Sequence, residues 1–339
     1  MNQLVSVIVP TYRGADKLSR AIESIIKQTY SPIEIIVVDD NDPQSKDRQK
    51  TQKIMKEFDF KNIKYIKHEC NKNGSAARNT GISHSSGEYI CFLDDDDFYL
   101  PDRVKKSVEV LEQNHLYDAV YCNVILTNSF QEISGVIHAD KELVQKDILL
   151  NENSIGTGSN LFVVKSALER LNGFDESFRR HQDLEFLLRY LEIFKIKNID
   201  EPLIVKAKNG TDNIPEYKGF LATKQHYWSK FNYVLDALDK NEKNMFYGYH
   251  YGVLLDVAIK SKNKEYINEA KYNLEKFRGL TKKEKLIMYL EFHPFIKLVS
   301  FNSLKKVNRL FSLFRKKRYF IEHEVREKVN ETFGLEVEV

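Results

Sequence analysis

Three short apolar runs, separated by helical patterns, constrain the fold of this chain more than any other feature. Residues 4–9, 33–38 and 63–66 are rich in Val and Ile, and the first two end in polar residues, as buried parallel strands do. Apolar side chains at helical spacing (Leu18, Ala21, Ile22, Ile25 and Ile26) lie between the first two runs, and a second helix is expected near residues 51–58. This β-α-β-α-β order predicts parallel strands joined by right-handed crossovers.

Four consecutive aspartates, Asp94 to Asp97, follow a fourth apolar run at residues 89–93. Carboxylates this close raise each other's pKa, and at the end of a buried strand they are costly unless a cation or hydrogen-bond donors meet them. Mg²⁺ takes one or two protein carboxylates and fills its other positions with water and substrate phosphates. The run therefore points to a metal-nucleotide site, or else to a solvated turn that starts a helix at Pro101.

Polar residues from three strand ends should meet in one crevice, because open parallel sheets bind ligands beyond the carboxyl ends of their strands. Thr11 and Tyr12 follow the first run, Asp39 and Asp40 follow the second, and the acidic run follows the fourth. No Gly-x-Gly-x-x-Gly or Walker sequence accompanies the first strand. Neither a dinucleotide fingerprint nor a P-loop therefore explains this crevice.

Two further segments carry groups that suit a substrate. Residues 71–81 are small and polar around Arg78, which is either a salt-bridge partner on the surface or a cation that compensates a diphosphate. Gly158 and Ser159 belong to a Gly-rich loop that either approaches a substrate closely or is only a turn.

The middle of the chain predicts a helix after Pro101, a strand at 119–125, a possible hairpin with 133–137 and a strand at 161–164. Asp183 then begins a helical pattern. It is either an N-cap, which is the routine role, or a general base within reach of a substrate hydroxyl. His181 has no second histidine at metal-ligand spacing, which is more typical of a structural role than of a metal ligand.

Charge is distributed unevenly along the chain. The net charge is +3, but the residues from Phe220 onward carry +8 and the rest carry −5. The acidic front half argues against a nucleic-acid groove, and we expect no nucleic-acid partner. Residues 295–319 combine basic and apolar side chains without an acid, which predicts a basic amphipathic helix that either lies on an anionic membrane or packs on the protein.

The compartment follows from three weaker signals. The three cysteines are odd in number and lack Cys-x-x-Cys spacing, so we expect reduced thiols. The N-terminus has no basic leader, and charged residues and a proline interrupt the apolar region at 286–301, so we expect neither a signal peptide nor a membrane span. A cytoplasmic protein is expected, peripheral on the inner face of the plasma membrane if the basic helix binds lipid.

The combined pattern resembles the inverting glycosyltransferase family 2, over about residues 1–215. The resemblance rests on residues 7–12, on the Asp39-Asp40 strand end, on 73–81, on the aspartates of 94–97 in the place of the family's aspartate-any-aspartate motif, and on 173–183. It implies a GT-A fold, α/β with a Rossmann-like, mostly parallel mixed sheet flanked by helices, and here a C-terminal helical extension. The expected divisions are a nucleotide-sugar half (1–100), an acceptor half (101–215) and a helical region (216–339).

The resemblance also assigns roles to residues. Asp183 falls on the family's catalytic base, and Asp96 with Asp94 would hold Mn²⁺ or Mg²⁺. The nucleotide side would comprise Pro10, Thr11, Tyr12, Asp39, Asp40, Asn73, Arg78, Asp94 and Asp95, and the acceptor side Gly158, Ser159, His181 and Gln182. Gln182 stands where family members commonly have Glu.

The implied reaction moves a sugar, with inversion, from a nucleotide-sugar to an acceptor hydroxyl. UDP is the family's common nucleotide, and the acceptor would be a glycan, a lipid-linked oligosaccharide or a protein in cell-surface polysaccharide synthesis. Two alternatives remain at the level of sequence: a non-catalytic nucleotide-sugar or glycan-binding module, and a sugar nucleotidyltransferase. The latter needs a Gly- and Lys-rich loop after the first strand, of which residues 13–17 are a poor version.

Overall fold

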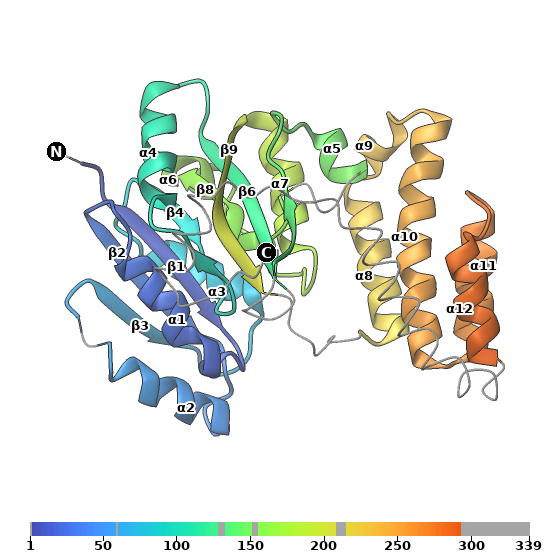
Figure 1. The fold of residues 1–339 in the computed structure, drawn as a ribbon, viewed down its shortest axis with the longest axis horizontal. Coiled ribbons are helices and arrows are strands. Elements are labelled where there is room, and N and C mark those ends of the chain that lie inside the picture. The colour runs from blue at the N-terminus through green and yellow to red at the C-terminus, as the bar shows by residue number, and fades with distance from the viewer. Residues whose placement is uncertain (1, 59, 128–132, 151–154, 208–214, 293–339) are drawn as a thin grey trace. The chain divides into compact units, whose positions relative to one another are not determined.

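The computed structural model describes residues 2–58, 60–127, 133–150, 155–207 and 215–292 (Figure 1). The described residues divide into two compact units, one that contains those up to 207 and one that contains 215–292. The expected basic helix at 295–319 lies outside the described residues.

The first unit is a mixed α/β structure. Its described residues form a nine-stranded sheet of order β3-β2-β1-β4-β8-β6-β9-β5, with β7 paired to β6. The strands are β1 (Val5–Thr11), β2 (Ile33–Asp39), β3 (Ile63–Lys67), β4 (Tyr89–Phe92), β5 (Phe98–Tyr99), β6 (Ala119–Thr127), β7 (Ile133–Ile137), β8 (Phe162–Val164) and β9 (Ile196–Ala207). The helices are α1 (Ala15–Ile26), α2 (Lys46–Met55), α3 (Gly74–His84), α4 (Arg103–Gln113), α5 (Gln145–Leu150), α6 (Lys165–Arg170) and α7 (Gln182–Ile193), with a 3₁₀ turn, η1 (Gly158–Asn160).

Four neighbouring strands, β3, β2, β1 and β4, are parallel, as the sequence predicts. Their register determines which residues lie at the same edge of the sheet. Thr11 pairs with Asp39, and Ile8 pairs with Phe92. The amide of Leu93 continues this pairing by donating to the Ile8 carbonyl at 2.9 Å. The polar residues after β1, β2 and β4 are therefore brought to the same edge of the sheet.

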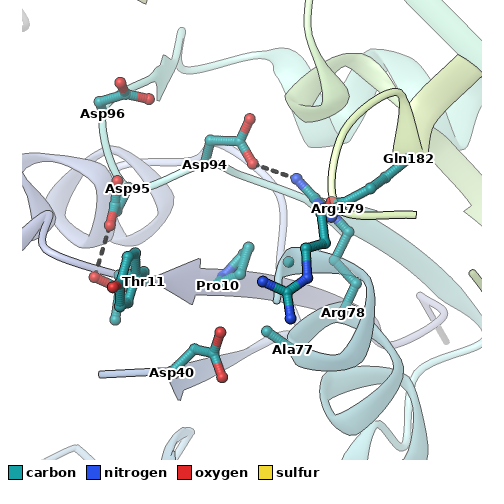
Figure 2. Close-up of a pocket in the computed structure, with 12 residues that line it drawn as sticks. Pro10, Thr11, Asp40, Ala77, Arg78, Asp94, Asp95, Asp96, Arg179 and Gln182 are labelled. Carbon is teal, nitrogen blue, oxygen red and sulfur yellow. Dashed lines mark hydrogen bonds and ion pairs between the residues drawn. The ribbon is translucent and has the colours of Figure 1, made fainter. Parts of the chain in front are cut away.

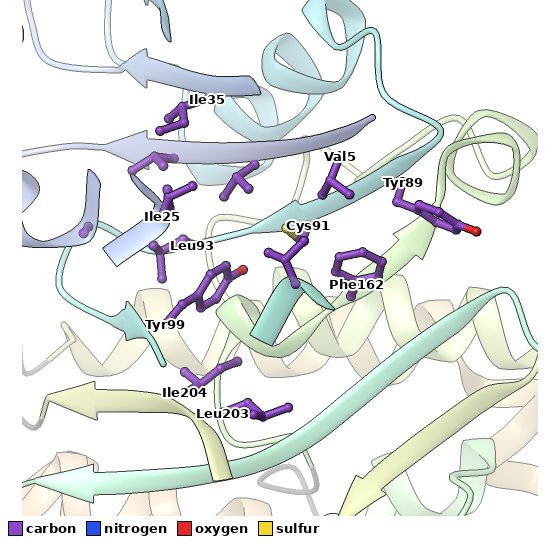
Figure 3. Close-up of a cluster of buried hydrophobic side chains, with 14 of the residues drawn as sticks. Val5, Ile25, Ile35, Tyr89, Cys91, Leu93, Tyr99, Phe162, Leu203 and Ile204 are labelled. Carbon is purple, nitrogen blue, oxygen red and sulfur yellow. The ribbon is translucent and has the colours of Figure 1, made fainter. Parts of the chain in front are cut away.

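Alternation along β1 separates the two faces of the sheet. Val5, Val7 and Val9 join a buried cluster with side chains of α1, α4 and β2, and Figure 3 shows part of this core around Cys91, Tyr99 and Phe162. Ile8 points to the opposite face, where a Cβ on Gly81 of α3 would lie 2.3 Å from its Cγ2. The absence of a side chain at Gly81 lets α3 pack closely on β1, and α3 starts beside the polar strand ends.

The second half of the sheet is antiparallel in part. Strand β8 is antiparallel to both β4 and β6, and the expected hairpin between β6 and β7 is confirmed. Strand β9, which no pattern in the sequence predicts, pairs parallel with β6, and the register is irregular near Cys122 and Asn123. The predicted fold class, a mixed sheet flanked by helices with a helical region after it, is confirmed.

The described part of the second unit is helical: α8 (Tyr217–Lys230), α9 (Asn232–Asp236), α10 (Lys240–Ser261), α11 (Lys264–Glu275) and α12 (Lys282–Phe292). A buried cluster joins α8, α10 and α11 through residues such as Tyr217, Leu254, Ala258 and Leu274. Among the described residues, no helix has the length and apolar character needed to cross a membrane.

Candidate active site

A pocket of about 320 Å³ opens at the edge of the sheet where β1, β2 and β4 end. Figure 2 shows its side chains converging from both halves of the first unit. Its lining contains nine of the predicted site residues, namely Pro10, Thr11, Tyr12, Asp40, Arg78, Asp94, Asp95, Asp96 and Gln182, together with Gly74, Ala77 and Arg179.

The four aspartates point in different directions. Asp97 is buried, and its Oδ2 accepts hydrogen bonds from the hydroxyls of Thr157 and Ser159, both at 2.7 Å. Burial raises the pKa of the Asp97 carboxyl to about 7. Asp97 does not line the pocket, so its carboxylate anchors the acidic turn to the loop before β8.

Asp95 holds the first strand end. Its Oδ2 accepts from the Thr11 hydroxyl at 2.6 Å, and burial raises the pKa of its carboxyl to about 7. A Cβ on Gly14 would lie 1.8 Å from the same oxygen, so glycine is required there for the two loops to meet. Asp95 therefore fixes the shape of the loop that follows β1.

Asp96 is the member of the run best placed for a cation. Its side chain is 34% exposed and lines the pocket, and Lys17 Nζ lies 4.0 Å from its Oδ2. Partial burial, followed by repulsion from Asp94, raises the pKa of the Asp96 carboxyl. A divalent cation would remove that repulsion, and carboxylate oxygens are the hard ligands that Mg²⁺ and Mn²⁺ prefer.

The described residues contain no group of three or more His, Cys, Asp or Glu side chains arranged to hold a metal. Two pocket carboxylates, Asp96 and Asp94, nevertheless match a cation that takes only one or two protein ligands and its others from a diphosphate. The residues present therefore fit Mn²⁺ or Mg²⁺ bound together with a nucleotide.

Asp40 organises the loop before α3. It is buried, and its carboxylate accepts from the amides of Lys72 and Asn73 and from Asn71 Nδ2 at 2.8–2.9 Å. The His68 ring nitrogen Nδ1 lies 2.7 Å from its Oδ1. Asn73 in turn caps α3, because its side chain accepts hydrogen bonds from the amides of Ser75 and Ala76. Asp40 and Asn73 therefore both shape the pocket wall, although only Asp40 lines the pocket.

Asp39 lies behind that wall. It is fully buried, forms an ion pair with Arg48 Nε at 3.0 Å and accepts from the Tyr65 hydroxyl at 2.5 Å. Burial raises the pKa of the Tyr65 hydroxyl, and the Asp39 carboxylate raises it further. Arg48 also donates to the backbone carbonyls of Asn41 and His68, and this network ties β2 to the end of β3.

Arg78 bridges the two halves of the first unit. Its Nη2 donates to Asp94 Oδ1 at 2.6 Å and its Nη1 donates to Gln182 Oε1 at 2.8 Å. Gly158 packs beside this guanidinium, since a Cβ there would lie 3.2 Å from Nη2. Ser159 is fully buried, and besides donating to Asp97 its hydroxyl accepts from the Asp94 amide at 3.0 Å.

The predicted base lies at the start of α7. Asp183 is half-buried and its Oδ1 accepts from the adjacent Leu184 amide at 3.0 Å. The N-cap position belongs to His181, which adopts a left-handed φ of 60° and makes no side-chain cap bond. Asp183 is therefore not the N-cap. Neither it nor His181 lines the pocket, but the adjacent Gln182 does.

Two of the remaining lining residues, Gly74 and Ala77, belong to the segment 73–81 that carries the family resemblance, whereas Arg179 was not predicted. The two small residues belong to the first turn of α3, whose face toward the pocket follows from their spacing relative to Arg78. Arg179 precedes α7 in a loop where neighbouring arginines are indistinguishable by sequence.

Comparisons with known proteins agree with this geometry. Residues 6–171 match the model of Glycosyl transferase family 2. An uncharacterized glycosyltransferase of Rickettsia typhi is 30% identical over 269 residues, which are 78% of this chain and 81% of that protein. The UDP-Glc:alpha-D-GlcNAc-diphosphoundecaprenol beta-1,3-glucosyltransferase WfgD of Escherichia coli is 31% identical over 196 residues, covering 58% of this chain and 72% of WfgD.

Two solved structures share the fold at 16% sequence identity and a TM-score of 0.53. They are TarS 1-349 of S. aureus in complex with UDP-GlcNAc, with 80% of this chain and 88% of that chain covered, and the mannosyltransferase PcManGT of Pyrobaculum calidifontis in complex with GDP-Man and Mn²⁺, with 87% and 86% covered. These matches favour a transferase over the binding module and the nucleotidyltransferase. The chain belongs to glycosyltransferase family 2 and is a glycosyltransferase with a GT-A fold.

Proposed function

We propose that this glycosyltransferase moves a sugar, with inversion and with the help of Mn²⁺ or Mg²⁺, from a UDP-sugar to an acceptor hydroxyl on a lipid-linked oligosaccharide or another glycan. The observation that carries the proposal is the pocket at the ends of β1, β2 and β4, where the Thr11 loop, Asp40 and the Asp94–Asp96 turn meet. A nucleoside, a diphosphate and a cation each find suitable groups in this one space.

The relatives support the choice of substrates. The name of WfgD specifies a UDP-Glc donor and a diphosphoundecaprenol-linked acceptor, and TarS binds UDP-GlcNAc. PcManGT binds GDP-Man with Mn²⁺, so the fold accommodates a different nucleotide. The sequence relationship to WfgD favours UDP and a lipid-linked acceptor for this chain.

The nucleotide would lie against Pro10, Thr11, Tyr12 and Asp40, with Asp39 and Asn73 holding that wall from behind and Asp95 fixing the Thr11 loop. Asp96, with Asp94, would hold the metal ion. When bound, the metal ion acts as a Lewis acid that stabilises negative charge on the departing diphosphate.

Asp183 would accept the proton of the acceptor hydroxyl as its oxygen attacks the anomeric carbon from the face opposite the diphosphate. The C–O bond to the diphosphate breaks as the new glycosidic bond forms, so the configuration inverts. Gly158, His181 and Gln182 would face the acceptor, and Ser159 would act from beneath by holding the Asp94 amide. Positioning of these groups supplies much of the rate.

The division of labour along the chain is part of the proposal. Residues 1–215 would form the catalytic domain and 216–339 a helical region, whose basic segment 295–319 would contact the anionic inner face of the plasma membrane, where a lipid-linked acceptor resides. No nucleic acid takes part.

A thermal-shift panel tests this function. UDP-, GDP- and dTDP-sugars, each with and without Mn²⁺, should produce a Tm increase that is largest for a UDP-sugar with metal, because a ligand of the native state stabilises by mass action. Release of UDP on adding a lipid-linked acceptor, with inverted product by NMR, completes the test. A protein that binds none of the donors in the presence of metal would refute the proposal.

A further inference from the structure

Arg78 is the arginine expected to meet a diphosphate, but both of its terminal nitrogens already hold protein partners. It is 9% exposed, and its two terminal nitrogens donate to Asp94 and Gln182 at 2.6 and 2.8 Å. The Phe174 ring lies beneath the guanidinium, 5.6 Å from Cζ to the ring centroid. To bind a phosphate with both terminal nitrogens aimed at it, Arg78 would have to turn away from Asp94 and leave that carboxylate unpaired beside Asp96.

Arg179 is in the opposite situation. It lines the same pocket from the loop before α7, and its side chain is exposed. Within the described part of the chain, it makes no hydrogen bond or ion pair. Figure 2 shows its guanidinium directed into the pocket, while that of Arg78 turns away toward Asp94.

The charges of the pocket call for such a group. Asp40, Asp94, Asp95 and Asp96 all line the space, and a nucleoside diphosphate adds two or more further negative charges. Arg78 neutralises Asp94, and a metal ion at Asp96 would neutralise part of the diphosphate. An arginine with its planar fork of donors unoccupied is suited to bind the remaining phosphate oxygens in a bidentate manner.

We propose that Arg179 binds the diphosphate of the donor, and that Arg78 is a positioning residue that holds Asp94 and the start of α7. This inference rests on the proposed function and names a binding residue for it. Arg179 stands four residues before Asp183. Its contact with the diphosphate would therefore fix the loop that leads to the base, so that donor binding orders the acceptor side of the site.

The experiment measures nucleotide affinity by calorimetry for the full chain with Mn²⁺, using UDP, GDP and dTDP and then the parent nucleoside of whichever binds. Arg179→Gln should weaken diphosphate binding about 10- to 100-fold, in line with the loss of charge-assisted hydrogen bonds, and leave nucleoside binding unchanged. Arg179→Lys should recover part of the affinity. The matched control is Arg180→Gln, which removes a neighbouring exposed arginine that does not line the pocket and should leave both affinities unchanged.

The outcomes separate the two proposals. If wild type binds a nucleoside diphosphate but Arg179→Gln binds it equally well, or loses nucleoside and diphosphate affinity alike, Arg179 is not the phosphate ligand while the proposed function stands. If Arg180→Gln causes the same loss, the effect is general charge and the assignment is also wrong. If wild type binds no nucleoside diphosphate, both proposals fail together.

Discussion

Ser159 Oγ donates a 2.7 Å hydrogen bond to Asp97 Oδ2 across 62 residues of sequence, and neither side chain is exposed. The same hydroxyl accepts from the amide of Asp94. One serine therefore connects the buried end of the acidic run to the end that lines the pocket, and this separates aspartates with structural roles from those open to a ligand.

Replacing Asp97 should cost stability, and replacing Asp96 should not. Asp97→Ala leaves the hydroxyls of Thr157 and Ser159 without their acceptor in a buried site, so we expect the free energy of unfolding to fall by about 1–3 kcal/mol. Asp96→Ala, at a partly exposed carboxylate, should change it by less than about 0.5 kcal/mol. Urea denaturation of the two variants measures both, and equal losses would contradict the division of roles.

Metal dependence should follow Asp96. Asp96→Asn removes an anionic ligand without changing shape, so we expect Mn²⁺ to stop stimulating transfer and the rate to fall by about 10²- to 10³-fold. Asp94→Asn should lose less metal stimulation, because Asp94 already pairs with Arg78. Titration of Mn²⁺ against the initial rate in metal-free buffer compares them, and a larger loss in Asp94→Asn would reverse the assignment.

Asp183→Asn tests the base. The variant should bind the donor as wild type does and lose transfer by about 10²- to 10⁴-fold, the usual contribution of general-base catalysis. Glu192→Gln, an exposed acid near the other end of α7, is the control and should keep full activity. Single-turnover rates at saturating donor give the comparison, and normal turnover by Asp183→Asn would show that another group takes the proton.

The free energy of unfolding of the helical unit should depend on pH because of Glu284. Hydrogen bonds from Arg278 and from Thr281 outweigh the effect of burial and lower the pKa of the Glu284 carboxyl to about 2. Because this folded-state pKa lies below the unfolded value of about 4.3, the stabilisation is present above that pH and is lost as pH falls toward 2. Glu284→Gln should therefore be less stable than wild type by about 1–3 kcal/mol at pH 7, with a smaller difference near about pH 3.5.

Glu275→Gln is the matched control for Glu284. Its carboxylate is exposed and lies 4.0 Å from Lys271, so the change in unfolding free energy should be at most a few tenths of a kcal/mol. Urea denaturation followed by circular dichroism at the two pH values provides the measurement. A stability difference for Glu284→Gln that does not shrink in acid would refute this linkage.

The basic segment 295–319 should attract anionic vesicles. Sedimentation with phosphatidylglycerol-containing liposomes should weaken as salt rises, because the attraction is screened. Changing Lys305, Lys306 and Arg309 to Gln should reduce binding about tenfold or more, and changing Lys264, Lys271 and Lys276, which lie in or next to α11, should not. Binding that ignores both salt and the first set of changes would exclude an electrostatic anchor.

The sequence predicts the parallel half of the sheet well, because each strand is a continuous apolar run with turn signals at its ends. Strand β9 escapes prediction because Asp200, Glu201 and Pro202 interrupt its pattern, and the irregular pairing with β6 that tolerates them is a property of two strands together. Strand β5 is only two residues long, which is too short for any periodicity.

The site could be located from sequence, since the register of parallel strands brings their polar ends together. The partner of each side chain could not. Arg78 and Gln182 are hydrogen-bonded although they are 104 residues apart in the sequence, and so are Asp97 and Thr157, which are 60 residues apart. Such pairs depend on where β8 and α7 fall in three dimensions, and local pattern contains no information on this. For the same reason, Arg179 and Arg180 look alike in the sequence, although one lines the pocket and the other does not.

Strand β8 enters the sheet between β4 and β6, antiparallel to both. The half of the first unit that contains β1 to β4 and the half that contains α7 therefore share one continuous hydrogen-bonded sheet. Within the described residues, a hinge does not separate these two halves. A rigid-body opening of the two halves would break backbone hydrogen bonds between strands at the centre of the sheet. We therefore expect donor entry and product exit to depend on the connecting loops at the strand ends. The rate of turnover should respond to substitutions in those loops and should not respond to changes that only stiffen the sheet.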